Sequence, residues 1–284
     1  MALFSDVLLT VDYDRTLTAP DSSIPPRNME AIHYFMDNGG AFTINTGRSL
    51  SMAKPIMDSV PMNAPILLYN GSAAYDLEKQ ELLFCHEIDL DPWETVAKCR
   101  ELFPDLMTEI QGLNANYRLW DNPAWDAFYA HIGVAHEFVQ PGDDIGPFLK
   151  FSVFGPITSV DADNFFVANA QEKARLDQVY DITKEVFGHK CQVYRSGDKI
   201  VDLLTPGVSK GLSARRLKKE LGRKLLVCAG DADNDRPMLQ DADYAFVPAD
   251  AALAGEFPTV CKCAEGAVAE VIYEKIPEIL KNIS

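Results

Sequence analysis

Long hydrophobic runs are missing from this sequence. It has no stretch of about 18 consecutive apolar residues, which is the length needed to span a membrane. The N-terminus also lacks a basic region ahead of an apolar core, because Asp6 interrupts it early. The pattern therefore predicts neither a transmembrane helix nor a secretory signal. We expect a cytoplasmic protein with no membrane partner.

Positive charge is scarce. The chain has 26 Lys and Arg residues against 42 Asp and Glu residues, which gives a formal net charge of −16. This balance argues against nucleic acid and against anionic membrane surfaces as the main partner. An anionic substrate would need a locally positive site, built from a metal ion, a Lys or Arg side chain and backbone N–H groups.

Cysteine is sparse and dispersed, with six residues in 284. Only Cys261 and Cys263 lie close together, and no second Cys or His pair accompanies them, so a zinc site is not predicted. The five histidines likewise lack the spacing of metal ligands. Without a secretory signal, the thiols are expected to be reduced. Internal repeats and low-complexity segments are also missing.

The remaining composition is that of an ordinary globular protein, with 47% hydrophobic and 24% charged residues. The first part alternates predicted strands, at residues 7–11, 41–45 and 65–69, with helices. One helix is expected after Pro25-Pro26 and should end at Asn38-Gly39, where Gly allows a left-handed cap. A βαβαβ order of this kind predicts a parallel sheet covered by helices.

The pattern changes near residue 85. Asp91-Pro92-Trp93-Glu94 has the residues of a helix start, and this helix should end near Phe103. We interpret the middle segment as an inserted α+β module. Its other expected elements are strands at 106–110, 117–120 and 149–154 and helices at 123–132 and 163–187.

Strands and helices then alternate again. Strands are expected at 200–204, 225–229 and 244–247, and Ser209 can cap a helix between the first two. The predicted fold class is α/β, with a Rossmann-like parallel sheet core and an inserted α+β cap domain. We expect a discontinuous core of residues 1–84 and 193–284 and a cap of residues 85–192.

Four polar clusters stand out in this pattern, and three of them follow strands. Carboxyl ends of parallel strands meet at one edge of a sheet, so distant residues can share one site there. The cluster around Lys210 opens a helix instead, where free N–H groups favour an anion. The clusters are Asp12-Tyr13-Asp14-Arg15-Thr16, Thr46-Gly47-Arg48, Ser209-Lys210-Gly211 and Gly230-Asp231-Ala232-Asp233-Asn234-Asp235.

Each cluster has an ordinary structural interpretation when taken alone. An Asp-x-Asp pair after a strand can be a solvated cap, Thr46-Gly47 can be a turn, and Lys210 can be a surface lysine. The acidic cluster that begins at Asp231 can also be a turn, although so many oxygen ligands in six positions are typical of a cation site. The joint order of the four clusters favours a shared site.

Together the four clusters resemble the motifs of the haloacid dehalogenase (HAD) superfamily. Its motifs are Asp-x-Asp-x-Thr, a strand-terminal Thr or Ser, a Lys, and Gly-Asp-x-x-Asn-Asp, and all four occur here in order. The segment between the Thr and Lys motifs resembles a cap of the C2B type. Thr46-Gly47-Arg48, Asn70-Gly71 and residues 207–211 resemble the Cof-type phosphatases in particular. The resemblance covers essentially the whole chain.

The resemblance implies catalytic roles. Asp12 would be the nucleophile, and Asp14 would protonate the leaving oxygen and then activate water. Thr46 and the Gly47 amide would hold phosphate oxygens. Lys210 would neutralise charge on Asp12 and on the phosphoryl group.

The resemblance also implies Mg²⁺ as cofactor. Asp231 would bind the ion together with the Asp12 carboxylate and the Asp14 backbone carbonyl, which suits a cation that prefers oxygen ligands. Asn234 and Asp235 would support the metal ion and Lys210 from behind.

Further residues are candidates for substrate contact. Arg48, Asn70 and Gly71 are expected at the phosphate site, although Arg48 could equally form a structural ion pair and Asn70-Gly71 could be only a turn. In the cap, strand alternation could place half of the candidates in the cap core or on its surface. The cap candidates are Asn114, Asn116, Tyr117, Arg118, Trp120 and Lys150.

Two residues depart from the family pattern. Arg15 stands where relatives often have Gly, and its side chain could contact substrate or lie in solvent. Asn45 replaces a small residue before Thr46, and could add a hydrogen bond or crowd the loop. Neither change affects a reacting group.

We therefore expect a Mg²⁺-dependent phosphatase that hydrolyses a small phosphorylated metabolite, with sugar phosphates as one candidate class. A phosphotransferase such as a phosphomutase would use the same nucleophile, so this alternative stays open. A non-catalytic metabolite sensor is a third possibility. We expect a monomer or a weak homodimer.

Overall fold

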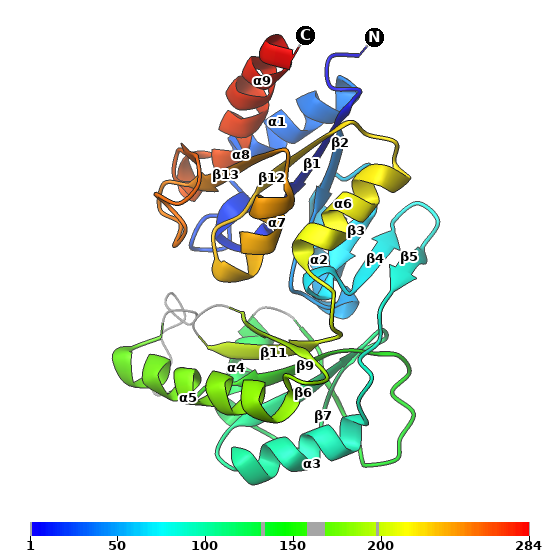
Figure 1. Cartoon of the computed structure of the whole chain (residues 1–284), viewed down its shortest axis with the longest axis vertical. Coiled ribbons are helices and arrows are strands. Elements are labelled where there is room, and N and C mark those ends of the chain that lie inside the picture. Colours follow the sequence, from blue (N-terminus) through cyan, green and yellow to red (C-terminus); the bar gives the residue numbers. More distant parts are fainter. Residues whose placement is uncertain (1, 132–133, 158–167, 197–198, 284) are drawn as a thin grey trace. The chain divides into compact units, whose positions relative to one another are not determined.

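The computed structural model describes residues 2–131, 134–157, 168–196 and 199–283 (Figure 1). The chain forms two compact units. Unit 1 comprises Met1–Thr46, Pro55–Phe84 and Ser209–Ser284, and unit 2 comprises Gly47–Lys54 and Cys85–Val208. The sequence placed 193–208 in the core, whereas the compact unit that contains them is unit 2. No helix in the described part of the chain is long and apolar enough to cross a membrane.

Unit 1 is built on a parallel sheet with the strand order β14-β13-β12-β1-β2. The interior strand β1, which lies between β12 and β2, is buried along its whole length, which agrees with its unbroken apolar run. These strands are β1 (Val7–Val11), β2 (Ala41–Ile44), β12 (Leu225–Ala229), β13 (Tyr244–Pro248) and β14 (Thr259–Val260).

A smaller sheet of β3 (Ile66–Leu68), β4 (Ala73–Asp76) and β5 (Glu81–Cys85) continues unit 1. The sequence predicted that the segment at 65–69 would join the parallel sheet. It does so through a parallel bridge between Asn45 and Leu67, while β3 also pairs antiparallel with β4. The short chain between β3 and β4 favours this antiparallel pairing.

Helices surround the parallel sheet of unit 1 (Figure 1). Pro26 opens α1, and Gly39 has the positive φ of 87° that the predicted helix end requires. Ser209 caps α6 by accepting a hydrogen bond from the Leu212 N–H, as predicted. The helices are α1 (Pro26–Asp37), α6 (Lys210–Glu220), α7 (Arg236–Asp241), α8 (Ala267–Glu270) and α9 (Ile276–Ile283), with α2 (Leu50–Ser59) divided between the units.

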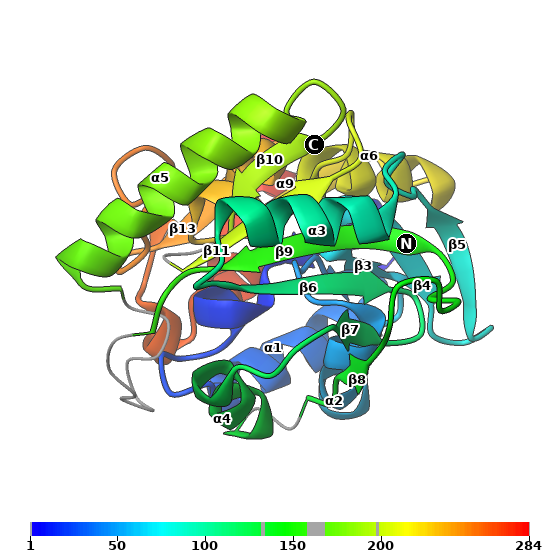
Figure 2. The ribbon, with the colours of Figure 1, turned by 90° about the horizontal axis from the view of Figure 1, so that it is seen from below.

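Unit 2 has a six-stranded sheet in the order β10-β11-β9-β6-β7-β8. Helices α3 (Pro92–Leu102) and α5 (Ala170–Phe187) cover one face of this sheet (Figure 2). The short helix α4 (Pro123–His131) carries Trp125 and Tyr129, which belong to a separate apolar cluster. The strands are β6 (Met107–Gly112), β7 (Asn116–Arg118), β8 (Glu137–Phe138), β9 (Phe148–Phe154), β10 (Gln192–Arg195) and β11 (Ile200–Leu204).

The strand at 200–204 was expected to resume the parallel core, and this expectation was wrong. It is β11, which pairs antiparallel with β9 and β10 in unit 2. An apolar run of five residues fits either kind of sheet, so its partner strands could not be read from the run itself.

The predicted helix at 163–187 is also shorter than expected. Residues 163–167 lie outside the described part of the chain, and α5 begins at Ala170. Asn169 sets this start, because its side chain accepts hydrogen bonds from two backbone N–H groups while Glu172 bonds back to the Asn169 N–H. The helix that begins after Asp91 was predicted correctly, and the Asp91 side chain accepts from the Glu94 N–H.

Candidate active site

Asp12 lies directly after β1, at the carboxyl end of an interior strand of the parallel sheet. Its N–H donates to the Ala229 carbonyl at 2.9 Å, which extends the β1–β12 pairing by one residue. A tight turn over residues 13–17 follows, and the Leu17 N–H donates back to the Asp12 carbonyl at 3.3 Å. The Asp12 side chain is therefore held by backbone contacts at an edge where open α/β sheets bind ligands.

Arg15 has a φ of 60° in this turn, a conformation that costs a non-glycine residue free energy. This explains why glycine suits the position. The Arg15 side chain is exposed, and the Arg15 N–H donates to Thr18 Oγ1.

Lys210 is the first residue of α6, and its side chain is fully buried. The ammonium Nζ lies 2.5 Å from Asp12 Oδ1 and 2.6 Å from Asp235 Oδ1. Two buried carboxylates thus share one buried cation. The predicted role of Lys210 as charge partner of Asp12 has this contact as its structural basis.

Asp235 joins Lys210 to the acidic loop that follows β12. Its Oδ2 accepts hydrogen bonds from the Asp231 and Ala232 N–H groups, while Oδ1 contacts Lys210. Gly230 is required beside it, because a Cβ at this position would lie 2.6 Å from the Asp235 Cβ. Asp235 therefore orients Lys210 and shapes the backbone that carries Asp231.

Thr46 follows β2 and is buried. Its N–H donates to the Leu67 carbonyl, and its carbonyl accepts from the Asn70 N–H. Asn70 Oδ1 in turn accepts from Asn234 Nδ2 at 3.3 Å. The predicted residues Thr46, Asn70 and Asn234 are therefore linked in one chain of contacts within unit 1.

The Asn45 side chain was expected either to add a hydrogen bond or to crowd the loop, and it adds a hydrogen bond. Its Nδ2 donates to the Lys210 carbonyl at 2.8 Å, so it joins the end of β2 to the start of α6. Gly71 also fits closely against this helix start, because a Cβ at Gly71 would lie 2.3 Å from the Ser209 carbonyl oxygen. Both residues fix where Lys210 begins its helix.

The electrostatics of the acidic groups are dominated by burial. Burial raises the pKa of Asp12 to about 7, with Lys210 opposing the shift and Asp235 reinforcing it. Burial and the neighbouring carboxylates raise the pKa of Asp231 well above its usual value. Burial alone would lower the pKa of Lys210, but the attraction of Asp12 and Asp235 raises it above its ordinary value.

The carboxylates could hold a cation. One oxygen from each of Asp12, Asp231 and Asp235 lies within 4.8 Å of the others. Burial, and after it the neighbouring carboxylates, raise the pKa values of Asp12 and Asp231, and the positive charge of a divalent cation would offset both effects. Oxygen donors of this kind suit Mg²⁺. Asp14 follows in the turn and is half-buried, and its expected contribution is its backbone carbonyl.

Most of the cap candidates are buried within unit 2. Tyr117 belongs to the hydrophobic core of unit 2 and Trp120 packs against it. Arg118 is buried and pairs with Glu109 and Asp126. Asn116 and Lys150 are also buried, whereas Asn114 is exposed. Gly47 and Arg48 belong to unit 2, although Thr46 belongs to unit 1.

Sequence reasoning missed the buried carboxylates Glu109, Glu172 and Asp202 of unit 2. A signal for Asp202 was present, since it interrupts the apolar run of β11. A carboxylate in such a run needs a buried partner.

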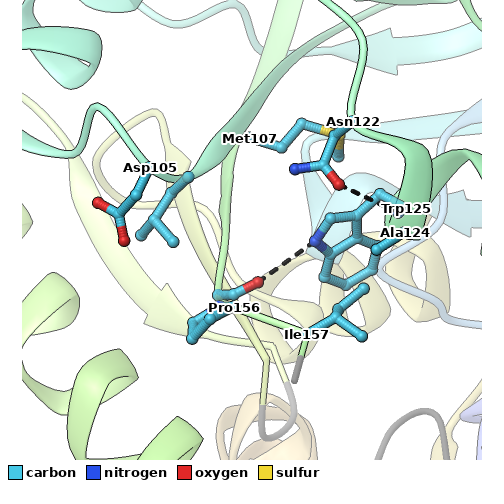
Figure 3. Close-up of a pocket in the computed structure, with 9 residues that line it drawn as sticks. Asp105, Met107, Asn122, Ala124, Trp125, Pro156 and Ile157 are labelled. Carbon is cyan, nitrogen blue, oxygen red and sulfur yellow. Dashed lines mark hydrogen bonds between the residues drawn. The ribbon is translucent and has the colours of Figure 1, made fainter. Parts of the chain in front are cut away.

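A separate hollow of about 150 Å³ lies in unit 2 between the start of β6, the start of α4 and the end of β9 (Figure 3). The Trp125 indole lies along it, and its Nε1 donates to the Gly155 carbonyl at 3.2 Å. The residues that line the hollow are Asp105, Leu106, Met107, Asn122, Ala124, Trp125, Gly155, Pro156 and Ile157. None of them belongs to the four motifs.

Comparisons with known proteins identify the family of this chain. A family model described as haloacid dehalogenase-like hydrolase matches residues 9–253. An HMP-PP phosphatase of Escherichia coli is 24% identical over 247 residues, which cover 84% of this chain and 83% of that protein.

Solved structures share the fold. A haloacid dehalogenase-like hydrolase from Bacteroides thetaiotaomicron aligns with a TM-score of 0.75 at 21% identity, covering 93% of this chain and 97% of that one. A sugar phosphatase of HAD subclass IIB aligns with a TM-score of 0.72 at 18% identity, covering 95% and 99% of the two chains.

Proposed function

Because the chain belongs to the family of haloacid dehalogenase-like hydrolases, we propose that it is a Mg²⁺-dependent phosphatase that hydrolyses a small phosphorylated metabolite. The observation that carries the proposal is the buried position of Lys210 between Asp12 and Asp235, with Asp231 in the same cluster of carboxylates. Phosphoryl transfer depends mainly on positioning and charge neutralisation, and this arrangement provides both.

In the first half of the reaction, an Asp12 carboxylate oxygen attacks phosphorus while the bond from phosphorus to the leaving oxygen breaks. Asp14 gives its proton to the leaving oxygen, so an alcohol departs and an aspartyl-phosphate is formed on Asp12. Thr46 and the Gly47 amide hold the phosphate oxygens, and Arg48, Asn70 and Gly71 complete the phosphate site.

In the second half, Asp14 takes a proton from a water molecule, whose oxygen attacks phosphorus. The bond between phosphorus and the Asp12 oxygen breaks, which releases phosphate and restores the Asp12 carboxylate. Lys210 neutralises negative charge on Asp12 in both halves, because its ammonium touches that carboxylate.

Asp12, the Asp14 carbonyl and Asp231 would hold Mg²⁺, with Asn234 and Asp235 supporting them. When bound, the ion supplies positive charge that allows an anionic nucleophile to approach an anionic phosphate. Asp235 already uses its oxygens for Lys210 and for two backbone N–H groups, so it is proposed as a positioning group.

The substrate class follows from the relatives and from the shortage of positive charge. Relatives are named HMP-PP phosphatase and sugar phosphatase, so HMP-PP and sugar phosphates should head the panel of compounds. The net charge of −16 disfavours nucleic acid as substrate. We also propose that the protein is cytoplasmic and that it is a monomer or a weak homodimer.

The proposal is tested by phosphate release from a panel of phosphorylated metabolites, with MgCl₂ and with a chelator. Asp12→Asn should lower the rate by at least about 10³-fold, since it removes the nucleophile. Asp37→Asn at the exposed end of α1 is the matched control and should keep parent activity.

The outcomes separate the alternatives. Release of free phosphate that requires Mg²⁺ and disappears in Asp12→Asn supports hydrolysis. Transfer of phosphate to a second metabolite with little free phosphate would favour a phosphotransferase. Tight Mg²⁺-dependent binding without turnover of any compound would favour a sensor.

A further inference from the structure

A second group of buried charges lies in unit 2, on the strands β9 and β11. Lys150 is only 5% exposed and Asp202 is fully buried, and Lys150 Nζ lies 3.2 Å from Asp202 Oδ2. Ser152, which lies opposite Asp202 on the neighbouring strand, donates to Asp202 Oδ1 at 2.6 Å. Ser196 also donates to Asp202. Asp202 is thus firmly held and neutralises Lys150.

The Lys150 ammonium has another bond, to the carbonyl oxygen of Gly47 at 2.8 Å. Gly47 is the residue after Thr46, and the chain passes from unit 1 to unit 2 at this peptide bond. Thr46 is anchored in unit 1 through its contacts with Leu67 and Asn70. Lys150 therefore anchors the other side of the same junction.

A second contact holds the same segment. Met52 packs against the apolar cluster that contains Met107, Trp125 and Tyr129. Residues 47–54 are thereby fixed to unit 2 at two points, one polar and one apolar. The polar point is the one made at the Gly47 peptide itself.

The bond to Gly47 is charge-assisted, and such bonds are about twice as strong as neutral ones. The Gly47 carbonyl and the Arg48 N–H belong to one peptide group. A cation on the carbonyl polarises this group and restrains Gly47, the residue whose own N–H is proposed to bind phosphate. It also fixes the orientation of that peptide plane.

We propose that Lys150, neutralised by Asp202, is a positioning residue that holds Gly47 in the conformation in which its N–H binds phosphate. This inference rests on the proposed phosphatase function and adds a residue of unit 2 to it. Lys150 acts through Gly47 and needs no contact with the substrate.

The test is the double variant Lys150→Met with Asp202→Asn. It removes both charges, so no uncompensated buried carboxylate is left to unfold the protein. Inorganic phosphate should bind about tenfold more weakly to the MgCl₂-loaded variant in a calorimetric titration. KM for the best substrate should rise by a similar factor, with a smaller change in kcat. Amide hydrogen exchange should become about tenfold faster in peptides that span residues 47–54.

A matched control removes another buried ion pair of unit 2. Lys199 and Glu172 are 3% and 2% exposed and lie 3.4 Å apart. Lys199→Met with Glu172→Gln should leave phosphate binding and exchange at 47–54 at parent values. Lys150→Arg keeps a cation and should restore most of the binding.

Equal phosphate affinity and equal exchange in the two double variants would overturn the proposal. The exchange measurement does not require turnover. If the parent protein neither binds nor releases phosphate, the proposed function fails, while faster exchange at 47–54 in the Lys150 variant would still support the anchoring of Gly47.

Discussion

At the scale of single residues, the site depends on one buried cation among several carboxylates. Lys210 contacts Asp12 and Asp235 directly, and Asp235 also orients the backbone at Asp231. Breaking a buried pair by removing one partner costs several kcal/mol, because the other charge remains buried. The residues proposed for the chemistry therefore also contribute to the free energy of unfolding of unit 1.

A pH dependence of metal binding follows from Asp12. In the metal-free protein its pKa is raised to about 7, so at pH 6 the group is mostly protonated and a cation must displace the proton. Mg²⁺ affinity should rise as the pH increases from 6 to 7, by up to about tenfold per pH unit for each proton released, and the raised pKa of Asp231 acts in the same direction. Calorimetric titration at several pH values checks this. Asp12→Asn should show a shallower dependence, and an equally steep one would contradict the assignment.

At the scale of elements, the start of α6 matters most, because Lys210 is its first residue. Ser209 caps this helix, Asn45 binds the Lys210 carbonyl, and Gly71 packs against the Ser209 carbonyl. Three separate segments of unit 1 thus determine where the helix begins and where its first side chain lies.

Ser209→Ala should lower the free energy of unfolding by about 1 kcal/mol, since it removes the N-cap hydrogen bond. It should also lower the rate of phosphate release, because Lys210 loses a defined helix start. Urea denaturation and the phosphate assay measure the two effects. Asp91→Ala removes the cap of α3 in unit 2 and should reduce stability alone. Unchanged activity in Ser209→Ala would show that Asn45 and Gly71 suffice.

At the scale of the whole molecule, the chain consists of two compact units, and the carboxylate cluster lies within unit 1. A ligand that binds only the folded state stabilises it by mass action. Because burial and the neighbouring carboxylates disfavour the charged forms of Asp12 and Asp231, a bound cation should stabilise unit 1.

Adding MgCl₂ at about 100 times its Kd should stabilise the protein by about 2.7 kcal/mol, and a chelator should reverse the effect. Thermal unfolding monitored by calorimetry or circular dichroism would show this as a rise in Tm. Asp231→Asn should reduce the rise strongly, whereas Asp37→Asn should preserve it. A rise of equal size in Asp231→Asn would argue against a metal site at this cluster.

The sequence by itself determined the elements that rest on local pattern and the order of the motifs. The buried run of β1, the N-caps Asp91 and Ser209 and the family membership were all predicted correctly, because each depends on neighbouring residues or on motif order. The approach of Asp12 to the acidic loop after β12 was also predictable, since parallel strand ends converge, whereas the role of Lys210 followed from the order of the motifs.

Only the tertiary structure decided which distant strands pair and which buried charges meet. It placed β11 in unit 2, gave Arg15 its left-handed backbone and joined Lys150 to both Asp202 and Gly47. An apolar strand is compatible with several neighbours, and a lysine with several carboxylates. The choice among them depends on packing and burial over the whole chain, which local pattern does not encode.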